Sequence, residues 1–408
     1  MPLVRIRPAP PPPKRWPKHV RNVCILLVVV AAGINVLRPV PPATITALAL
    51  PTTVAQQVAV EWPATGEAAL QVAGISPILD NGQTAPAATA SIAKVITALT
   101  VLQKKPLLPD TTGGTITLTP SDVDLYNTYL AQDGSVLPVT AGQQLSEYDA
   151  LAAILLPSAN NIADTFAIWG YGTMTAYRGA ATQFVHDLGL TNTVIGSDAS
   201  GYLADTTSTP RDLIVLGEQA MQNPVFAQIV GLPRTTIAGQ GTIYNFNSML
   251  GDDGIVGIKT GNNNEDPGAF LFAANYQVSK GHSVVIYGAV LNAPSLRSAL
   301  LSSVPIINSA QQALEYVTPV RAKQTIATVK TAWGASTTAV AASDVSLVHW
   351  KGNDLMTTAS VPAHTTAFKK GATLGTVKIT SNDKISSANV VLSKDVPKPS
   401  FWWRLTRH

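Results

Sequence analysis

The 408-residue chain is poor in the residue types on which several classes of protein depend. Cys24 is the only cysteine, so no intrachain disulfide can form. The six histidines are scattered and none belongs to an H-E-x-x-H motif, so the pattern of a zinc peptidase is missing. Because only 13% of the residues are charged, the composition argues against a nucleic-acid partner, and no motif indicates a metal or another cofactor. Hydrophobic residues make up 46% of the chain, enough for a large core.

Acidic residues are absent from residues 1–40, whereas the rest of the chain holds 24 acidic and 21 basic residues. Six cations precede an uncharged run, residues 23–37. Cations before an apolar run indicate an N-terminus held in the cytoplasm with the body of the protein exported. We therefore predict that residues 1–22 form a basic, proline-rich cytoplasmic segment and that the body lies outside the plasma membrane. The basic residues of this region are Arg5, Arg7, Lys14, Arg15, Lys18, Arg21 and, after the run, Arg38.

The apolar run 23–37 leaves two interpretations open, a transmembrane anchor and a signal peptide. It is shorter than the roughly 17–25 residues of a spanning helix and suits the apolar part of a signal peptide. However, no small-x-small cleavage site follows directly, because Ala47-Leu-Ala49 lies ten residues beyond Leu37. We favour a single N-terminal span and keep secretion after cleavage as the alternative.

Residues 38–57 are predicted to be a stalk, since they are rich in Pro, Ala and Thr. The first domain is predicted over residues 58–317. It begins with strand-like runs, continues through a mostly helical stretch at 121–230, and returns to strands after Gly254. This order predicts an α/β fold in which an antiparallel sheet carries helices, including a helical subdomain.

The end of the first domain and the rest of the chain show a different pattern. A final helix is predicted over residues 297–316. Residues 318–396 alternate polar and apolar residues with period two, which predicts a small all-β domain. Residues 397–408 form an aromatic and basic tail, either a membrane-interface segment or a loose end.

Ser91 and Lys94 form a Ser-x-x-Lys motif in an almost wholly apolar helix. From Ile92 to Leu102 only Lys94 and two threonines are polar, so the helix should be buried on every side. Burial lowers the pKa of a lysine toward the range in which its amine can act as a base. Because Ser91 lies one turn earlier on the same face, we predict a nucleophile and its base. The alternative for this motif alone is an N-capping serine and a lysine that reaches solvent.

Two further polar motifs interrupt apolar segments. Ser158-Ala-Asn160 separates two hydrophobic runs, and its buried hydroxyl and amide need partners that Ser91, Lys94 and a bound peptide could supply. Lys259-Thr-Gly261 ends a strand of Gly, Ile and Val, where a cation can favour the neutral form of Lys94 and attract an anionic substrate. The glycine allows a ligand to approach the backbone closely.

The chain also contains a second copy of the first motif. Ser381 and Lys384 match Ser-x-x-Lys, and Ser387-Ala-Asn389 matches the second motif soon after. These residues lie at a predicted hairpin turn between two alternating runs, where no buried helix holds the side chains. We therefore predict that the second copy has no catalytic role.

The ordered triple S-x-x-K, S-x-N and K-T-G resembles the signature of penicillin-binding proteins. Specifically, residues 58–395 resemble the low-molecular-mass members that act as D-alanyl-D-alanine carboxypeptidases. The likeness rests on residues 90–98, 155–161, 184–193 and 257–261. It implies a DD-peptidase/β-lactamase-like fold, peptidoglycan stem peptides as substrates, β-lactams as covalent inhibitors and a bacterial cytoplasmic membrane.

The resemblance also implies roles for single residues. Ser91 would attack the carbonyl between two D-alanines, Lys94 would take its proton, and Ser158 would relay a proton to the departing D-alanine. Asn160 would orient Lys94 and the peptide. The remaining implied roles are an oxyanion hole from the backbone N–H groups of Ser91 and Asn262, and carboxylate binding by Lys259, Thr260 and Arg297, with Gly261 beside them.

The chain departs from the family pattern in the segment 262–267, Asn-Asn-Asn-Glu-Asp-Pro, where a bulkier residue and a threonine are usual. Three rival functions remain at this stage. A D,D-endopeptidase would use the same residues. A β-lactamase commonly needs a loop glutamate between the second and third motifs, and Glu218 is the only glutamate there. A non-catalytic wall-binding or β-lactam-sensing protein would lack a catalytic residue.

Overall fold

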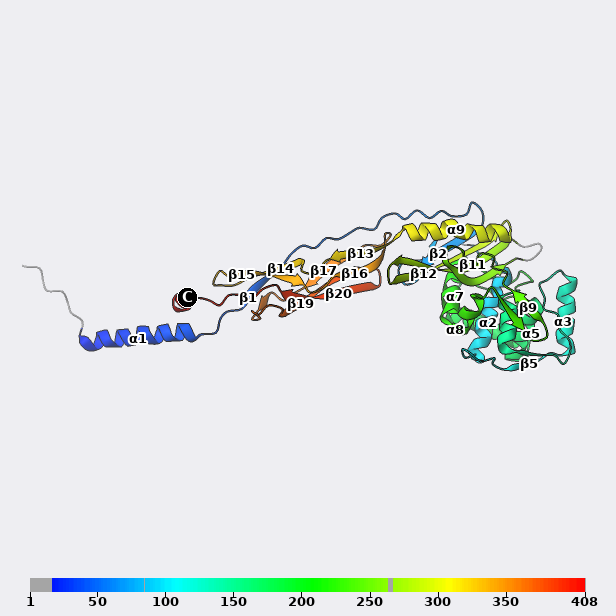
Figure 1. Ribbon diagram of the computed structural model, residues 1–408, viewed down its shortest axis with the longest axis horizontal. Coiled ribbons are helices and arrows are strands. Elements are labelled where there is room, and N and C mark those ends of the chain that lie inside the picture. Colours follow the sequence, from blue (N-terminus) through cyan, green and yellow to red (C-terminus); the bar gives the residue numbers. More distant parts are fainter. Residues whose placement is uncertain (1–16, 84, 263–266, 408) are drawn as a thin grey trace, which may run out of the picture.

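The computed structural model describes residues 17–83, 85–262 and 267–407. Most of the predicted segment 1–22, with its first four basic residues, and most of the loop 262–267 lie outside this description. The molecule is elongated (Figure 1): a helix-rich body stands at one end, a narrow β domain in the middle and a lone helix at the other end.

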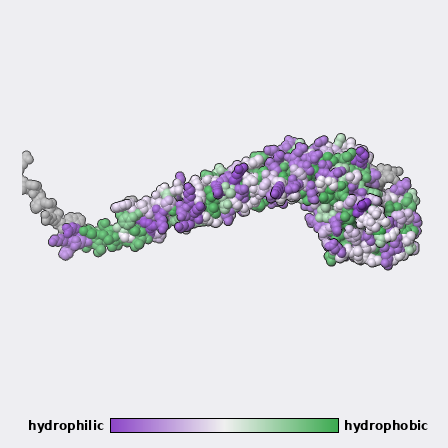
Figure 2. Space-filling view, viewed as in Figure 1, coloured by the Kyte–Doolittle hydropathy of each residue, from purple (hydrophilic) through white to green (hydrophobic). Residues whose placement is uncertain are grey.

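The lone helix is α1, Lys18–Leu37, and it packs against little of the protein. Its 20 residues span about 30 Å, the thickness of a bilayer's hydrocarbon core. Figure 2 shows the apolar surface that this helix exposes. The helix starts five residues before the uncharged run 23–37, and by length and composition it could cross a membrane, as an anchor or a signal sequence does.

A five-stranded antiparallel sheet forms the middle layer of the helix-rich body, with strand order β10-β11-β12-β2-β3. Both faces of this sheet are buried, since helix α9 covers one face and α7 lies on the other, with α8 against β10. Accordingly, every residue of strand β11 from Gly268 to Ala274 is buried. The elements are β2 Glu67–Val72, β3 Leu79–Asp80, β10 Ile255–Gly261, β11 Gly268–Ser279, β12 His282–Ala293 and α9 Leu296–Gln312.

Helices α2 to α8 form the helical subdomain beneath the sheet. Ser146 caps α4 and accepts the N–H of Asp149, and Thr209 caps α7 with Pro210 in its first turn. The helices are α2 Ala93–Lys104, α3 Pro120–Ala131, α4 Glu147–Leu155, α5 Asn160–Tyr171, α6 Met174–Asp187, α7 Pro210–Gln222 and α8 Pro224–Val230. Short strand pairs join them: β4 Ala87–Ala88 with β7 Thr207–Ser208, β5 Thr115–Thr117 with β6 Gln144–Ser146, and β8 Arg234–Ile237 with β9 Gly241–Tyr244.

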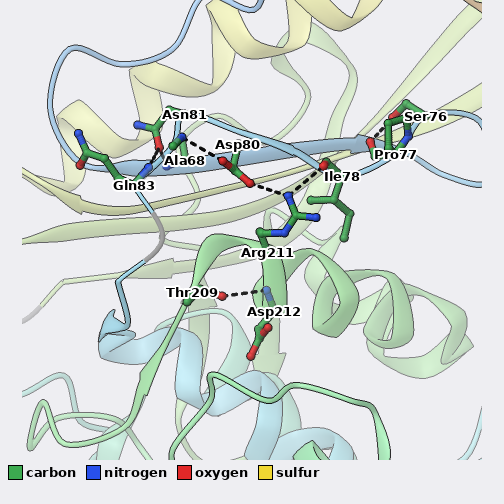
Figure 3. A network of polar contacts seen from close by, with 11 residues as sticks. Ala68, Ser76, Pro77, Ile78, Asp80, Asn81, Gln83, Thr209, Arg211 and Asp212 are labelled. Atoms are coloured by element: carbon green, nitrogen blue, oxygen red, sulfur yellow. Dashed lines mark hydrogen bonds and ion pairs between the residues drawn. The ribbon is translucent and has the colours of Figure 1, made fainter. Parts of the chain in front are cut away.

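Arg211 ties the helical subdomain to the edge of the sheet (Figure 3). From the first turn of α7 its guanidinium donates to the carbonyl of Ile78 and binds the carboxylate of Asp80 in β3. On the same helix, Asp212 follows the capping Thr209, whose hydroxyl accepts its N–H. These contacts fix the start of α7 against β3.

The C-terminal domain is built of strands, but its boundaries differ from those predicted. The helix predicted to end at residue 316 ends at Gln312, because residues 314–320 pair with β16 as strand β13. Part of the predicted stalk 38–57 is also a strand: Ala43–Ala47 pairs with β14 and β18, since Ala43 and Ile45 bury their side chains in the β-domain core.

The strands of this domain form a seven-stranded sheet and a two-stranded one, and the tail ends in a short helix. They are β1 Ala43–Ala47, β13 Leu314–Val320, β14 Thr325–Lys330, β15 Ser336–Ala341, β16 Val345–Trp350, β17 Met356–Ser360, β18 His364–Thr365, β19 Thr373–Ser381, β20 Lys384–Leu392 and helix α10, Phe401–Thr406.

Candidate active site

Ser91 and Lys94 lie at the entrance of helix α2. Residues 90–92 form one 3₁₀ turn that runs directly into α2, and every residue from Ala93 to Leu102 is buried. The Lys94 side chain is fully buried, and Ser91 is 5% exposed. Their Nζ and Oγ atoms are 2.8 Å apart. The helix therefore holds the amine in contact with the hydroxyl rather than in solvent.

The Lys94 amine has two further partners. It donates to Oδ1 of Asn160 at 2.7 Å and to the backbone carbonyl of Ser200 at 2.9 Å. Burial lowers the pKa of Lys94 to about 7, although the negative charges of Asp198 and Asp164 oppose this shift. The amine is thus neutral in a large share of molecules near neutral pH.

Ser158 lies in the tight connection between α4 and α5. Its φ of +64° is in the left-handed region, and the side chain is 4% exposed. Among the described residues its hydroxyl has no hydrogen-bond partner, although it is buried. Since an unpaired buried hydroxyl is unfavourable, it is suited to bind a group that enters the site.

The third motif lies in β10, which within the described residues is an edge strand that pairs with β11 alone. Lys259 is 2% exposed and donates to the carbonyl of Thr260 at 3.0 Å. Burial, together with the nearby Lys94 amine, holds the pKa of Lys259 well below its usual value. A Cβ on Gly261 would lie 2.9 Å from the carbonyl oxygen of Thr89, so only glycine lets β10 pass this close to the turn of Ser91.

The three motifs meet at a cavity of about 160 Å³. It brings together five of the nine predicted site residues in its lining, with Lys94, Lys259 and Gly261 directly behind them. Arg297 is not among them, because it is exposed and borders a separate hollow beside Glu61. The lining residues are Ser91, Asp133, Gly134, Ser135, Ser158, Asn160, Tyr202, Phe246, Thr260, Asn262 and Leu296.

Sequence reasoning missed the polar residues that surround Lys94 on its far side. Tyr129 donates to Asp164 at 2.7 Å, and Asp198 binds the hydroxyl of Ser200. Both aspartates are buried, at 5% exposure. The sequence pattern could have identified Asp164, since this residue interrupts the apolar face of helix α5. Asp198 lies in a loop whose sequence does not show that it is buried.

Comparisons with known proteins agree with this geometry. A family model described as D-alanyl-D-alanine carboxypeptidase matches residues 77–293. A D-alanyl-D-alanine carboxypeptidase of Streptomyces sp. strain K15 is 29% identical over 238 residues, 54% of this chain and 77% of that protein. The D-alanyl-D-alanine carboxypeptidase DacB2 of Mycobacterium tuberculosis is 30% identical over 183 residues, 41% of this chain and 62% of that protein.

A solved structure supports the architecture over a longer stretch. Penicillin binding protein 5 from Haemophilus influenzae superposes with a TM-score of 0.59 at 18% identity and covers 84% of this chain and 100% of its own. This likeness confirms the predicted fold class, an antiparallel sheet with helices followed by C-terminal strands.

Proposed function

Because this chain belongs to the D-alanyl-D-alanine carboxypeptidase family of serine peptidases, we propose that it removes the terminal D-alanine from peptidoglycan stem pentapeptides through an acyl-enzyme on Ser91. The family assignment gives the class of enzyme, a serine hydrolase that cleaves between two D-alanines. The residue roles rest on the site itself.

The arrangement around Lys94 carries the proposal. A neutral amine has two N–H donors and one lone pair, and two of the three contacts of Nζ are oxygens that can only accept. If both N–H groups point to Asn160 and Ser200, the lone pair faces the hydroxyl of Ser91 at 2.8 Å. Ser91 then donates its proton toward Lys94, as a nucleophile does to its general base.

The reaction proceeds in two halves. The Ser91 oxygen bonds to the carbonyl carbon between the D-alanines while its proton passes to Lys94; the C–N bond then breaks, and the leaving amine takes up that proton. Water next attacks the ester carbon and gives one proton to Lys94, the bond to the Ser91 oxygen breaks, and the serine takes up the proton that came from water. Ser158 is suited to relay the proton to the leaving group, because its hydroxyl lines the cavity and lacks a partner among the described residues.

The substrate is proposed to bind beside the edge strand β10. Its terminal carboxylate would lie at the Thr260 hydroxyl, with Lys259 directly behind. A carboxylate there favours the charged form of Lys259 and so offsets the effect of burial. The backbone N–H groups of Ser91 and Asn262 are proposed to stabilise the oxyanion, a donor pair whose single members are worth about 3–4 kcal/mol in other enzymes. β-Lactams are proposed to acylate the same serine.

Contacts between the two ends of the chain favour the anchor over the signal peptide. The Arg407 guanidinium donates to the carbonyls of Asn35 at 2.7 Å and Arg38 at 2.6 Å, and Arg404 donates to Val36. Arg404 in α10 and Arg407 directly after it thereby satisfy carbonyls at the end of α1 that a helix leaves unpaired. We propose that α1 stays attached and spans the bacterial plasma membrane with the body outside. An intact mass of the mature protein that lacks residues 18–37 would contradict this.

The reaction is tested by mass spectrometry of a stem pentapeptide after incubation with the full chain in detergent. We expect loss of one D-alanine, and no loss with Ser91→Ala. A crosslinked peptide dimer, offered in parallel, separates the alternatives: cleavage of the dimer alone would indicate an endopeptidase. Turnover of a β-lactam with neither peptide cleaved would indicate a β-lactamase, although Glu218 does not line the cavity.

A further inference from the structure

The loop 198–202 reaches the active site from behind Lys94. Its Ser200 carbonyl accepts the amine at 2.9 Å. Gly201, at a φ of +72°, passes so close to the carbonyl of Ala90 that a Cβ there would overlap it. The loop therefore packs directly on the turn that carries the nucleophile.

Asp198 holds this loop in shape. One of its carboxylate oxygens, Oδ2, accepts the N–H of Ser200 at 3.2 Å and of Tyr202 at 2.9 Å, and it also binds the Ser200 hydroxyl. Asp164 on α5 adds a second tie, since its Oδ1 accepts the N–H of Ala199 at 2.8 Å. The position of the Ser200 carbonyl thus depends on two carboxylates.

The turn itself does not require a charge at position 198. All the loop contacts use Oδ2, whereas Oδ1 is buried and has no hydrogen-bond partner among the described residues. An asparagine could accept the same bonds through its single carbonyl oxygen. A buried, unpaired carboxylate oxygen is costly in free energy. A carboxylate rather than an amide at position 198 therefore needs an explanation other than the shape of the loop.

The charged groups around Lys94 supply that reason. Burial alone disfavours the ammonium, and the second lysine of the site, Lys259, lies nearby on β10. The opposing negative charges come from Asp198 and from Asp164, which faces Tyr129 on α3. Tyr177 on α6 reaches the same pocket through the hydroxyl of Thr97.

We propose that Asp198 and Asp164 are positioning residues for the base: they place the carbonyl that holds the Lys94 amine, and their charge compensates its proton during the reaction. The inference rests on the proposed function, in which Lys94 receives the proton of Ser91. Without the carboxylates the ammonium would lose its counter-charge. The pKa of Lys94 would then fall further, because burial would act unopposed.

The test is the pH dependence of Ser91 acylation by a fluorescent penicillin, measured with the full chain in detergent. In the wild type the acid limb of the second-order rate reports the base. Asp198→Asn keeps an acceptor for the loop but removes the charge. We expect its acid limb to move to lower pH by about one unit, so that the ratio of rates at pH 5.5 and pH 8.5 rises about tenfold.

Asp212→Asn is the matched control. Asp212 is 7% exposed and likewise holds a turn, since it accepts the N–H of Asn192 and the hydroxyl of Thr193. It does not contribute to the charge around Lys94. We expect its acid limb to stay in place. A shift in both variants would contradict the proposal, as would a loss of rate for Asp198→Asn that is equal at every pH.

Tyr129→Phe provides a milder variant in case Asp198→Asn does not fold. It removes the donor to Asp164 while keeping a ring next to Tyr202. Burial raises the pKa of Asp164 to about 6, and the Tyr129 donor opposes this rise. Loss of the donor therefore weakens the negative charge, and the acid limb should move in the same direction by less. An unmoved limb would contradict the proposal. Failure of the proposed function looks different, because wild-type Ser91 would then not be labelled at any pH.

Discussion

The chain carries the motif Ser-x-x-Lys twice, and the two copies differ in secondary structure, in the burial of the lysine and in the partners of the serine. Ser91 and Lys94 lie on a buried turn and helix, with the amine fully buried and 2.8 Å from the hydroxyl. Ser381 and Lys384 face each other across the β19–β20 hairpin, and Lys384 is exposed. Ser381 is buried, but its hydroxyl contacts Nδ1 of His349 at 2.9 Å.

This difference shows what the motif needs for chemistry. Burial of the lysine shifts its pKa toward neutrality, and fixed acceptors leave its lone pair for the serine. The amine of Lys384 is exposed on a hairpin and is not held beside a serine in this way. The prediction that the second copy lies at a hairpin turn is confirmed, and the absence of a catalytic role there remains to be tested.

The largest expected effect comes from the two serines. Ser91→Ala should abolish labelling by a fluorescent penicillin, because loss of a nucleophile can cost about a millionfold in rate. Ser381→Ala should be labelled at the wild-type rate. Gel fluorescence of both variants beside the wild type checks this. Equal labelling of Ser91→Ala would mean that another serine is the nucleophile.

Substitution of the two lysines should change the acylation rate by different factors, and the larger of these should be smaller than the effect of Ser91→Ala. Lys94→Met should lower the acylation rate by about 10²–10⁴, the usual contribution of a general base. Lys384→Met should leave it unchanged, since that amine is exposed on the hairpin. Stopped-flow acylation of the two variants gives the comparison. If both lose activity alike, burial is not what distinguishes the two motifs.

The pH profile of the wild type should reveal a base that titrates near neutrality. The pKa of Lys94 is about 7. The proton-free amine is the active form, so the acylation rate should be constant above this value and fall about tenfold per unit below it. Rates between pH 5 and pH 9 test the prediction. An acid limb at pH 9 or above would indicate an amine with an ordinary pKa.

The smallest effect concerns stability. Ser381→Ala leaves Nδ1 of the buried His349 without its partner, which should cost about 1–3 kcal/mol in the C-terminal domain. Thermal unfolding of that variant should therefore begin earlier, while its penicillin acylation stays normal. An exposed serine of the same hairpin, Ser387, offers the control: Ser387→Ala should change neither property.

Sequence reasoning could predict the parts of this molecule that depend on local patterns. The all-round burial of helix α2 follows from the apolar residues on each of its faces, and the caps at Ser146 and Thr209 follow from turn chemistry. The contacts that depend on distant segments could not be found in this way. Strand β1 joins the C-terminal sheet although it precedes that domain by more than 250 residues, and its composition resembles a linker.

The same limit applies to the site. Ser91, Ser158 and Thr260 carry recognisable motifs, and the structure brings them to one cavity. The roles assigned to them remain proposals. No sequence motif marks Asp198, because its contacts with the site arise only when the loop 198–202 folds back toward Lys94 on α2. Arg297 was selected by resemblance; it borders the hollow beside Glu61, while its neighbour Leu296 lines the cavity of Ser91, and its role stays a prediction.

The central claim is that the Lys94 amine is neutral in a large share of molecules at physiological pH while it contacts Ser91. NMR titration of the protein with ¹³Cε-labelled lysine, with Lys94→Met to assign the signal, measures this directly. We predict one lysine signal that titrates at a pKa of about 7 and disappears in the variant. A Lys94 signal that titrates near 10.4, the value of a lysine in water, would contradict the account.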